Sequence, residues 1–327
     1  MRTPRVLAFA TTLVVLLGAC SSGGGSSPSA ASSTGASRAP ASAEASAPAS
    51  QAAKAPIRIG SDDFYESKLM AEIYGQVLEA NGYTVERKLG LGTREQRIPI
   101  MNAGQVDLVP EYVGSGLGFY DTTKISGDGA KNAAALQTAL TAKQQTVLGI
   151  SPGQDSNAFV VRKDTADTLH LTKMSDLAAV QTQLTWGLPS NCDANPLCSG
   201  ALKLYGITYP PAKRSALGAG GVPMATALQG KAIDLAELCS TQPAIVQFGF
   251  VQLTDDKATQ PAENIAPIVR DDYLAKVDKA SFQALLDAAS AKMTTEELTK
   301  LGVEIAVNNK DVVEVAKTWL AAQGLVK

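Results

Sequence analysis

The sequence predicts an α/β fold with two lobes and a helical C-terminal segment. Short β-rich runs alternate with longer amphipathic patterns over residues 57–109, the order that βαβ units produce, which indicates a parallel sheet. A second alternating series covers residues 159–253, and from residue 271 onward the pattern is helical. These observations together indicate two α/β lobes with helices closing the chain.

The first series contains five expected elements in the order strand, helix, strand, helix, strand. They span residues 57–60, 66–81, 84–89, 94–103 and 106–109. In the first helix, Leu69, Ile73 and Val77 recur at helical spacing and form one apolar face. Gly82 follows at the position where a glycine commonly ends a helix, so this boundary is well defined.

The second series and the C-terminal segment are assigned to strands and helices from the same kinds of hydrophobic pattern. Strands are expected at residues 185–188, 233–238 and 251–253, with helices near residues 197–205 and 223–228. Two further helices are expected at the end of the chain. Apolar faces extend over Ala291 to Leu301 and over Val312 to Ala322.

The N-terminal residues are expected to lie outside the fold. Basic and then apolar residues precede Gly18 and Ala19, which permit cleavage directly before Cys20, as in a bacterial lipoprotein signal over residues 1–19. The apolar run is too short to span a bilayer of about 30 Å. Lipid on Cys20 would anchor the chain to the extracytoplasmic face of the cell membrane, and the Ser, Ala, Gly and Pro residues over 20–55 would form a disordered tether. An ordinary secretory signal with a chance cysteine is the alternative.

Composition narrows the class of partner and of chemistry. The formal net charge is −2 and no cluster of basic residues follows the tether, which argues against nucleic acid as a partner. His170 is the single histidine, so no His-based metal site and no Ser, His and Asp triad is predicted. We expect no cofactor and no catalytic residue. A lipoprotein hydrolase or transferase on the same scaffold is the enzyme alternative.

Three cysteines remain beside the lipidation site. Cys192 and Cys198 stand six positions apart, and in an exported chain such a pair is expected to form a disulfide. Because the closed loop is short, the chain-entropy model gives it about 2 kcal/mol of stabilisation. Zinc binding is the weaker alternative. Cys239 lies in an apolar run and is expected to be a buried, unpaired thiol.

Asp62 and Asp63 follow the first expected strand. Adjacent residues at a strand end point to opposite faces, so the two carboxylates do not predict a catalytic pair. Capping or hydrogen bonding to a ligand is the expected role.

Several motifs are specific enough to indicate a family. The first lobe contains Ile59 to Tyr65, Gly92 to Glu95 and Asp107 to Gly114, and the second contains Ile233 to Leu235 followed by Ser240 and Thr241. Asp255 to Lys257 and Asn264 to Arg270 complete the set. These motifs resemble the substrate-binding proteins of osmoprotectant ABC importers, the ProX/OpuAC-like group that binds glycine betaine, choline and carnitine. The resemblance covers essentially residues 56–327.

The resemblance implies a two-lobed periplasmic-binding-protein type II fold with two chain crossings. Lobe one would comprise residues 56–154 plus 262–327, and lobe two residues 155–261. A receptor of this type closes on a small-molecule solute by hinge bending and presents it to ABC permease subunits with a cytoplasmic ATPase. The resemblance implies a monomer anchored to the membrane by its lipid.

The resemblance also implies ligand contacts from both lobes. They are Asp63, Phe64, Tyr112, Ser115, Asn157, Thr241, Gln242 and Glu263. Relatives hold a quaternary ammonium in a box of tyrosines. This chain keeps Tyr112, whereas Asn157, Cys239 and Glu263 stand where relatives have aromatic side chains.

The ligand therefore stays open at this point. The family favours a quaternary amine, and the polar substitutions also suit another solute, such as a polyol, a polyphenol or another cation. A sensor or adaptor lipoprotein that no longer serves transport is a third possibility.

Overall fold

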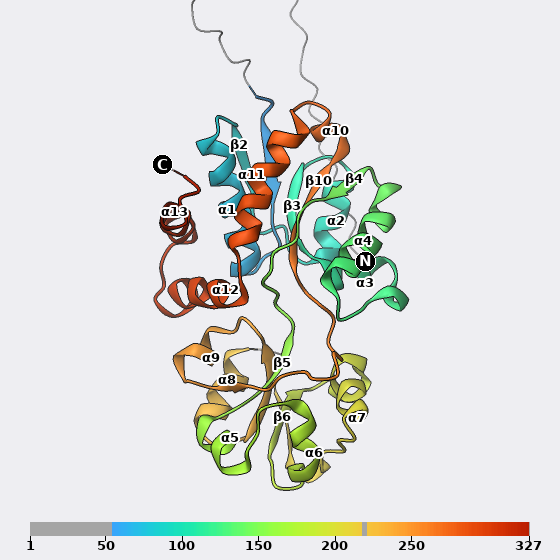
Figure 1. Cartoon of the computed structure of the whole chain (residues 1–327), viewed down its shortest axis with the longest axis vertical. Helices are drawn as coiled ribbons and strands as arrows, with labels where there is room; N and C mark the ends of the chain where they lie inside the picture. Colours follow the sequence, from blue (N-terminus) through green and yellow to red (C-terminus); the bar gives the residue numbers. More distant parts are fainter. Residues whose placement is uncertain (1–53, 218–220, 327) are drawn as a thin grey trace, which may run out of the picture. The chain divides into compact units, whose positions relative to one another are not determined.

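The computed structural model describes residues 54–217 and 221–326. The expected signal peptide, the lipidation site at Cys20 and most of the expected tether lie outside these residues. Within the described residues, the chain forms two five-stranded sheets, and helices flank both of them (Figure 1). This arrangement is the two-lobed α/β fold that the sequence predicts.

The first sheet has the strand order β2-β1-β3-β10-β4. Its strands are β1 (Ile57–Gly60), β2 (Val85–Lys88), β3 (Leu108–Tyr112), β4 (Gln145–Val147) and β10 (Ile265–Arg270). β1 is parallel to β2 and β3, whereas β10 is antiparallel to β3 and β4. The parallel arrangement expected for residues 57–109 is therefore confirmed for β1, β2 and β3, and β10 adds an antiparallel strand that this pattern did not cover. β10 enters the sheet from the second lobe, so it runs opposite to the strands that lead toward that lobe.

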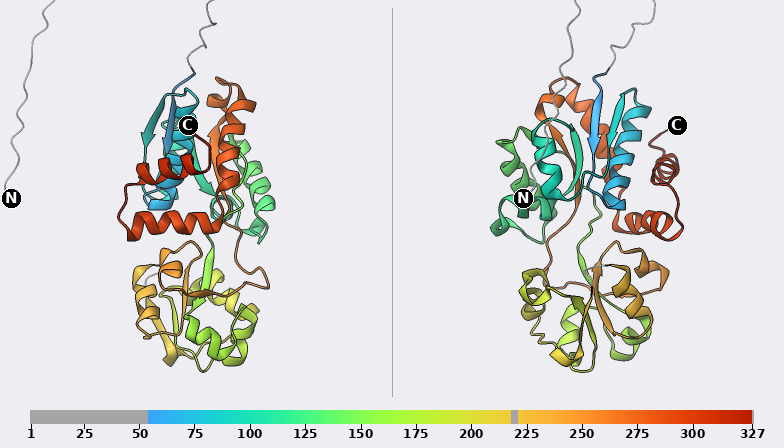
Figure 2. Two further views of the ribbon diagram at one scale, coloured as in Figure 1. Left: turned by 60° about the vertical axis from the view of Figure 1, so that its left-hand side comes forward. Right: turned by 180° about the vertical axis from the view of Figure 1, so that it is seen from behind.

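Helices cover both faces of the first sheet. They are α1 (Tyr65–Ala80), α2 (Arg94–Asn102), α3 (Val113–Tyr120), α4 (Gly129–Thr141), α10 (Asp271–Leu274), α11 (Lys279–Lys292), α12 (Thr295–Gly302) and α13 (Val312–Ala322). α11 and α13 pack against α1, and the views in Figure 2 show the C-terminal helices beside it. Alternate strand residues separate two cores: Ile59 and Leu108 face the α1 side, and Val109 and Ile268 face the α3 and α4 side.

The second sheet has the order β7-β6-β8-β5-β9. Its strands are β5 (Asn157–Val161), β6 (Trp186–Pro189), β7 (Arg214–Leu217), β8 (Leu235–Cys239) and β9 (Val251–Gln252). Its helices are α5 (Lys163–Leu169), α6 (Leu177–Val180), α7 (Ala201–Leu204), α8 (Val222–Gln229) and α9 (Pro243–Gln247). β6 is parallel to β7 and β8, whereas β5 is antiparallel to β8 and β9. This sheet is also mixed rather than parallel.

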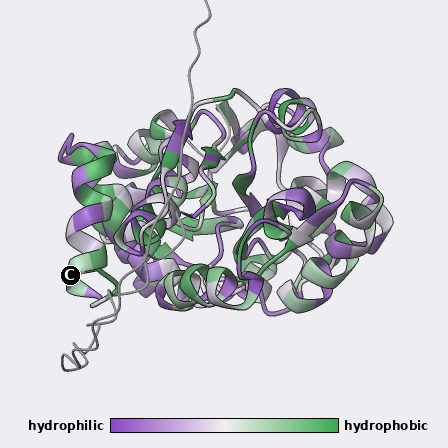
Figure 3. Ribbon diagram, turned by 90° about the horizontal axis from the view of Figure 1, so that it is seen from above, coloured by the Kyte–Doolittle hydropathy of each residue, from purple (hydrophilic) through white to green (hydrophobic). Residues whose placement is uncertain are grey.

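Amphipathic helices account for the packing of both sheets. In α1, Leu69, Ile73 and Val77 are buried at intervals of four, which places them on one face. The helix ends at Ala80 with Asn81 as its C-cap, and Gly82 follows with φ +80°, the left-handed conformation that glycine adopts without steric cost. Hydrophobic and hydrophilic residues alternate along the helices throughout the described chain (Figure 3).

The C-terminal helices differ from the prediction at one point. The stretch from Ala291 to Leu301 is not a single helix, because α11 ends at Lys292 and α12 begins at Thr295. Thr294 starts the new helix, since its hydroxyl accepts a hydrogen bond of 3.1 Å from the backbone N–H of Glu297. The break therefore has a local cause, namely an N-cap at Thr294.

Two chain segments connect the sheets (Figure 1). The chain leaves the first sheet after β4 and returns to it at β10, and the two segments meet at a β-bridge between Gln154 and Asn264. These are the two crossings of a type II fold. Strand membership places residues 57–147 and 265–270 in one sheet and residues 157–252 in the other. The finer lobe boundaries remain a prediction. Among the helices that the structure describes, none is long and apolar enough to cross a membrane.

Candidate ligand-binding site

The loops after β1, β3 and β8 meet beside the first crossing segment. There the backbone N–H of Ser156 donates to the Ser240 hydroxyl at 3.0 Å, and the N–H of Thr241 donates to Asp155 Oδ1 at 3.2 Å. On one flank α9 packs against α12. Gly302 of α12 approaches Tyr65 closely, since an added Cβ would lie 2.9 Å from the Tyr65 hydroxyl. Residues from both sheets therefore contribute to one region.

Tyr112 and Glu66 form the buried centre of this region. The Tyr112 hydroxyl donates to Glu66 Oε1 at 2.6 Å, and the two residues are 7% and 2% exposed. The other carboxylate oxygen, Glu66 Oε2, is buried and has no hydrogen-bond partner. A buried carboxylate with one unsatisfied oxygen carries a substantial desolvation cost.

Asp155 places a second carboxylate beside Glu66. Burial, together with repulsion from Asp155, raises the pKa of Glu66 to about 8, although Tyr112 and Thr241 partly offset the effect. Burial also raises the pKa of Asp155, despite its hydrogen bonds from Thr241 and Ser240. Both carboxyl groups are therefore held in an environment that lacks a compensating positive charge.

Phe64 and Tyr112 give this region an aromatic wall. Their ring centroids lie 5.9 Å apart, and Phe64 is 42% exposed, which is unusual for so large an apolar side chain. Burial raises the pKa of Tyr112 well above its ordinary value, and the negative charge of Glu66 adds to the effect. The Tyr112 hydroxyl is thus a stable donor rather than a titrating group.

Ser115 and Glu263 contact each other. The Ser115 hydroxyl donates to Glu263 Oε1 at 2.6 Å, and its backbone N–H donates to Oε2 at 2.9 Å. Glu263 therefore caps the first turn of α3. Gly114 permits this approach, because an added Cβ would lie 2.8 Å from the Ala262 carbonyl oxygen. Burial raises the pKa of Glu263 to about 7, although the Ser115 hydrogen bonds lower it in part.

Asn157 lies at the edge of a polar cavity next to the crossing segments. Its amide donates to Gln260 Oε1 at 3.3 Å, and both side chains line a cavity of about 410 Å³ together with Gln154 and Asp255. Cys239 is the cross-strand partner of Asn157 in the second sheet. Two of the positions at which relatives were expected to carry aromatic side chains are thus direct neighbours here.

The remaining predicted contacts are spread out. Thr241 lies beside Tyr65 and Glu66, whereas Gln242 is the half-buried residue before α9. Asp63 points to solvent and pairs with Lys68 at 2.6 Å. Asp62 points inward, as expected for adjacent residues at a strand end, and is 5% exposed. The structure therefore brings Tyr112 and Thr241 to the Glu66 carboxylate, packs Phe64 against Tyr112 and leaves Asp63 at the rim.

A buried ion network supports the loops that carry Phe64 and Tyr112. Arg97 is 2% exposed and pairs with Asp62 at 2.6 Å and with Glu111 at 2.5 Å, while Arg94 pairs with Glu111 at 2.8 Å. Burial disfavours the Glu111 carboxylate, but attraction from Arg97 and Arg94 outweighs it and lowers the pKa to about 2. Glu111 Oε1 also accepts from the backbone N–H of Tyr112 at 2.8 Å.

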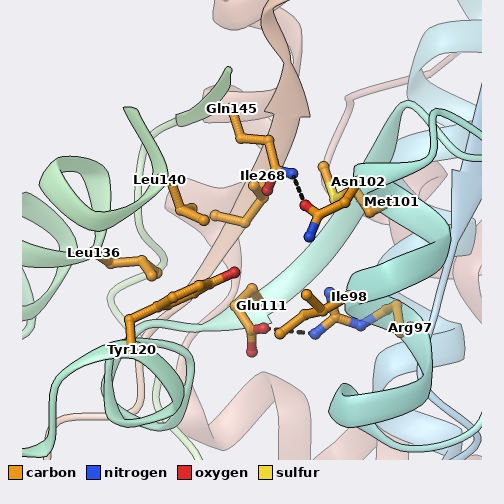
Figure 4. A pocket seen from close by; sticks show the side chains of 10 residues that line it. All are labelled: Arg97, Ile98, Met101, Asn102, Glu111, Tyr120, Leu136, Leu140, Gln145 and Ile268. Carbon is orange, nitrogen blue, oxygen red and sulfur yellow. Dashed lines mark hydrogen bonds and ion pairs between the residues drawn. The ribbon is translucent and has the colours of Figure 1, made fainter. Parts of the chain in front are cut away.

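Figure 4 shows Arg97 directed toward Glu111 at the wall of a small cavity in the first lobe. Its volume of about 10 Å³ would hold at most one water molecule, so this cavity is a packing feature rather than a solute site. Both arginines are engaged by carboxylates of the protein itself. They fix the loop after β1 to the end of β3.

Glu66 and Asp155 are site residues that the sequence did not lead us to expect. A signal for Glu66 existed, because it stands three and seven positions before Leu69 and Ile73 and hence on the buried face of α1. An acidic residue on an apolar face is unusual unless it has a partner or a function. Asp155 offered no such signal, since its burial depends on the contact between crossing segment and second sheet.

The predicted disulfide is confirmed. Cys192 and Cys198 are bonded with a Cα–Cα distance of 5.1 Å, and Cys239 is a free, half-buried thiol. Because the disulfide uses both thiols, the zinc alternative is wrong. The disulfide fixes the loop after β6, and Glu237 lies beside it.

Comparison with known proteins identifies the family. Residues 55–322 match the model of the OpuAC family, described as the substrate binding domain of an ABC-type glycine betaine transport system. The chain belongs to this family. As an OpuAC-family member it is a solute-binding receptor of an ABC transporter and not an enzyme.

Individual relatives agree with this assignment. The glycine betaine-binding protein YehZ of Escherichia coli is 26% identical over 288 residues, which cover 84% of this chain and 93% of the relative. A glycine-betaine-binding protein of Pseudomonas aeruginosa is 25% identical, with coverage of 83% and 88%. The solved structure of a glycine betaine/carnitine/choline ABC transporter protein superposes with a TM-score of 0.74 at 22% identity, covering 82% of this chain and 99% of that one. This last similarity supports the fold.

Proposed function

We propose that this protein captures a small solute of the osmoprotectant class that carries a cationic nitrogen, and that it delivers this solute to an ABC permease with a cytoplasmic ATPase. The ligand lies between the loops after β1 and β3 and the loop after β8. The predicted contacts Phe64, Tyr112, Asn157 and Thr241 surround it, and the pair of Ser115 and Glu263 lies close by. Glycine betaine and carnitine, which the relatives are named for, define the class.

The observation that carries this proposal is the buried pair of carboxylates. Glu66 and Asp155 adjoin an aromatic wall, and in the described part of the chain neither forms an ion pair. Removing two such groups from water without a counter-charge is unfavourable, so a bound cation would relieve the cost. Aromatic faces such as those of Phe64 and Tyr112 add attraction for an organic cation.

We further propose that the chain acts outside the cytoplasm, held by lipid on Cys20 at the cell membrane, and that it works as a monomer. The lipoprotein pattern before Cys20 and the Ser, Ala, Gly and Pro composition of residues 20–55 support this placement. A Cys20→Ser variant should appear in the soluble extracytoplasmic fraction rather than in the membrane. Membrane association unchanged by this substitution would count against the anchor.

Thermal shift of the purified protein tests the function directly. The panel contains glycine betaine, choline, carnitine, proline betaine, primary amines, sugars, polyols and polyphenols. A ligand at a hundred times its Kd stabilises the folded state by about 2.7 kcal/mol, which shifts the Tm of a domain of this size by several degrees. A shift with one or more of the cations and none with sugars supports the proposal. A shift confined to uncharged solutes, or none at all, contradicts it.

A further inference from the structure

The unpartnered oxygen of Glu66 carries information about the ligand. Four buried side-chain atoms in the described residues lack a hydrogen-bond partner, and Glu66 Oε2 is the one that lies in the candidate site. Tyr112 holds Oε1 at 2.6 Å and so fixes the carboxylate, while Oε2 has no partner in hydrogen-bonding geometry, although the Thr241 hydroxyl lies close enough to lower the pKa of Glu66. Asp155 of the crossing segment and Thr241 of the second lobe lie beside the same carboxylate. The unpartnered oxygen therefore lies where the ligand would meet both lobes.

We propose that the ligand is an organic cation with N–H donors, and that Glu66 Oε2 accepts one of these hydrogen bonds. This inference rests on the proposed function and narrows its substrate class. A protonated amine or a guanidinium supplies both the positive charge and the donor that this carboxylate lacks. Charge-assisted N–H···O bonds are among the strongest that a buried carboxylate can form.

A quaternary ammonium fits this site less well. It has no N–H to donate, so Glu66 Oε2 would stay unsatisfied beneath it. It also depends on several aromatic faces, and this chain has Asn157, Cys239 and Glu263 where further rings were expected. Phe64 and Tyr112 alone form one wall rather than a box.

A zwitterion such as a betaine meets a second difficulty. Its carboxylate needs a positively charged or N–H partner, and the cations nearest the site are already engaged. Arg97 is fully buried between Asp62 and Glu111, and Arg94 makes three hydrogen bonds to Glu111 at 2.8 to 3.1 Å. The structure therefore favours a ligand whose net charge is positive.

A methylation series separates these possibilities. Ethanolamine, N-methylethanolamine, N,N-dimethylethanolamine and choline share one hydroxyethyl group and one positive charge but carry three, two, one and no N–H donors. Isothermal titration calorimetry of the purified full-length protein should give the lowest Kd for ethanolamine. The last methylation should weaken binding at least tenfold, because it removes the final charge-assisted hydrogen bond. Glycine betaine should bind more weakly than ethanolamine.

Two variants test whether Glu66 is the group that accepts the hydrogen bond from the ligand. Glu66→Gln should raise the Kd for ethanolamine at least tenfold and flatten the series, since a neutral amide replaces the acceptor. Glu237→Gln is the matched control, because Glu237 is also a buried glutamate with an unpartnered oxygen but lies beside the Cys192–Cys198 disulfide. It should leave the series unchanged. The series on the unmodified protein needs no variant, so a Glu66→Gln protein that fails to fold does not weaken the test.

The outcomes test the proposed N–H donor of the ligand separately from the proposed receptor function. If choline or glycine betaine binds more tightly than ethanolamine, the inference is wrong and the receptor function stands; Glu66 and Asp155 then share a proton instead of holding an N–H. If no solute of the whole panel binds, the proposed function itself fails. Tightest binding of ethanolamine that is lost in Glu66→Gln and kept in Glu237→Gln supports both.

Discussion

Replacing Arg97 with methionine should destabilise the protein by about 3 kcal/mol at pH 7. Arg97 is buried and pairs with both Asp62 and Glu111, so its removal leaves two buried carboxylates without their main counter-charge. Although burial opposes ionisation of Glu111, Arg97 and Arg94 lower its pKa from 4.5 to about 2. At about 1.4 kcal/mol for each tenfold change, this lowering corresponds to roughly 3 kcal/mol, which Arg97 and Arg94 supply together, and removing one partner of a buried ion pair typically costs about 3 to 5 kcal/mol.

The loss of stability in Arg97→Met should depend on pH in a defined direction. Because the pKa of Glu111 is lower in the folded state, the stabilisation is fully present above pH 4.5 and is lost as the pH falls toward 2. The difference between the wild-type protein and Arg97→Met should therefore shrink to about 2 kcal/mol by pH 3.5. Methionine keeps the helix propensity and most of the volume of arginine, so α2 itself should persist.

Urea unfolding at pH 7 and pH 3.5, followed by circular dichroism, measures both values. Lys300→Met is the control, because Lys300 forms an exposed pair with Glu296 one turn away, and solvent screens such a pair so that its loss should hardly change stability. A loss below 1 kcal/mol for Arg97→Met, or a loss that does not change with pH, would refute the reasoning about the buried network.

Three further perturbations have defined outcomes. Burial raises the pKa of Glu237 from 4.5 to about 7, so its contribution to stability is present below pH 4.5 and lost as the pH rises through 7. Glu237→Gln should therefore stabilise the protein by about 3 kcal/mol at pH 8 and hardly at pH 4, and equal unfolding curves at pH 8 would contradict this. Reduction of the Cys192–Cys198 disulfide should lower the free energy of unfolding by about 2 kcal/mol, with three rather than one free thiol counted afterwards in the protein from residue 54 onward. Tyr112→Phe removes the hydroxyl that donates to the buried Glu66 carboxylate. It should lower the free energy of unfolding, measured with urea at pH 9, by about 1 to 3 kcal/mol. An unchanged unfolding midpoint would show that this hydrogen bond contributes little.

Local elements of the fold were predicted correctly where the hydrophobic periodicity and the residues that start or stop an element agreed. The strand at residues 57–60 and the helix that Gly82 ends were correct, because alternation, helical periodicity and a glycine stop signal pointed to the same answer. The break between α11 and α12 was missed, although Thr294 and Glu297 form the spacing of an N-terminal cap. That signal was local and available.

The direction of β10 in the first sheet could not be predicted from the local sequence. A strand's neighbours and direction depend on how the chain returns between lobes, and nothing within residues 265–270 tells whether β10 runs parallel or antiparallel to β3. The family resemblance supplied the two crossings, whereas periodicity alone suggested parallel sheets. Long-range pairing is thus the part of the fold for which local sequence gave no information.

The residues of the candidate site were also predicted only in part. Tyr112 and Phe64 were expected from the motifs that carry them, and the structure places them side by side. Glu66 was missed although its place on the apolar face of α1 was a local signal. Asp155 was missed because its burial and its repulsion of Glu66 arise only when the end of β1, the first crossing and the loop after β8 come together. Charge balance in a pocket is a tertiary property, so it required the structure.

Equilibrium dialysis of the purified protein against radiolabelled ethanolamine and choline tests the central claim most directly. We expect saturable binding of one organic cation per chain, weakened at least tenfold by Glu66→Gln and retained by Glu237→Gln. Absence of saturable binding for both cations, or equal binding by the two variants, would contradict a receptor whose ligand lies on the buried carboxylates between its lobes.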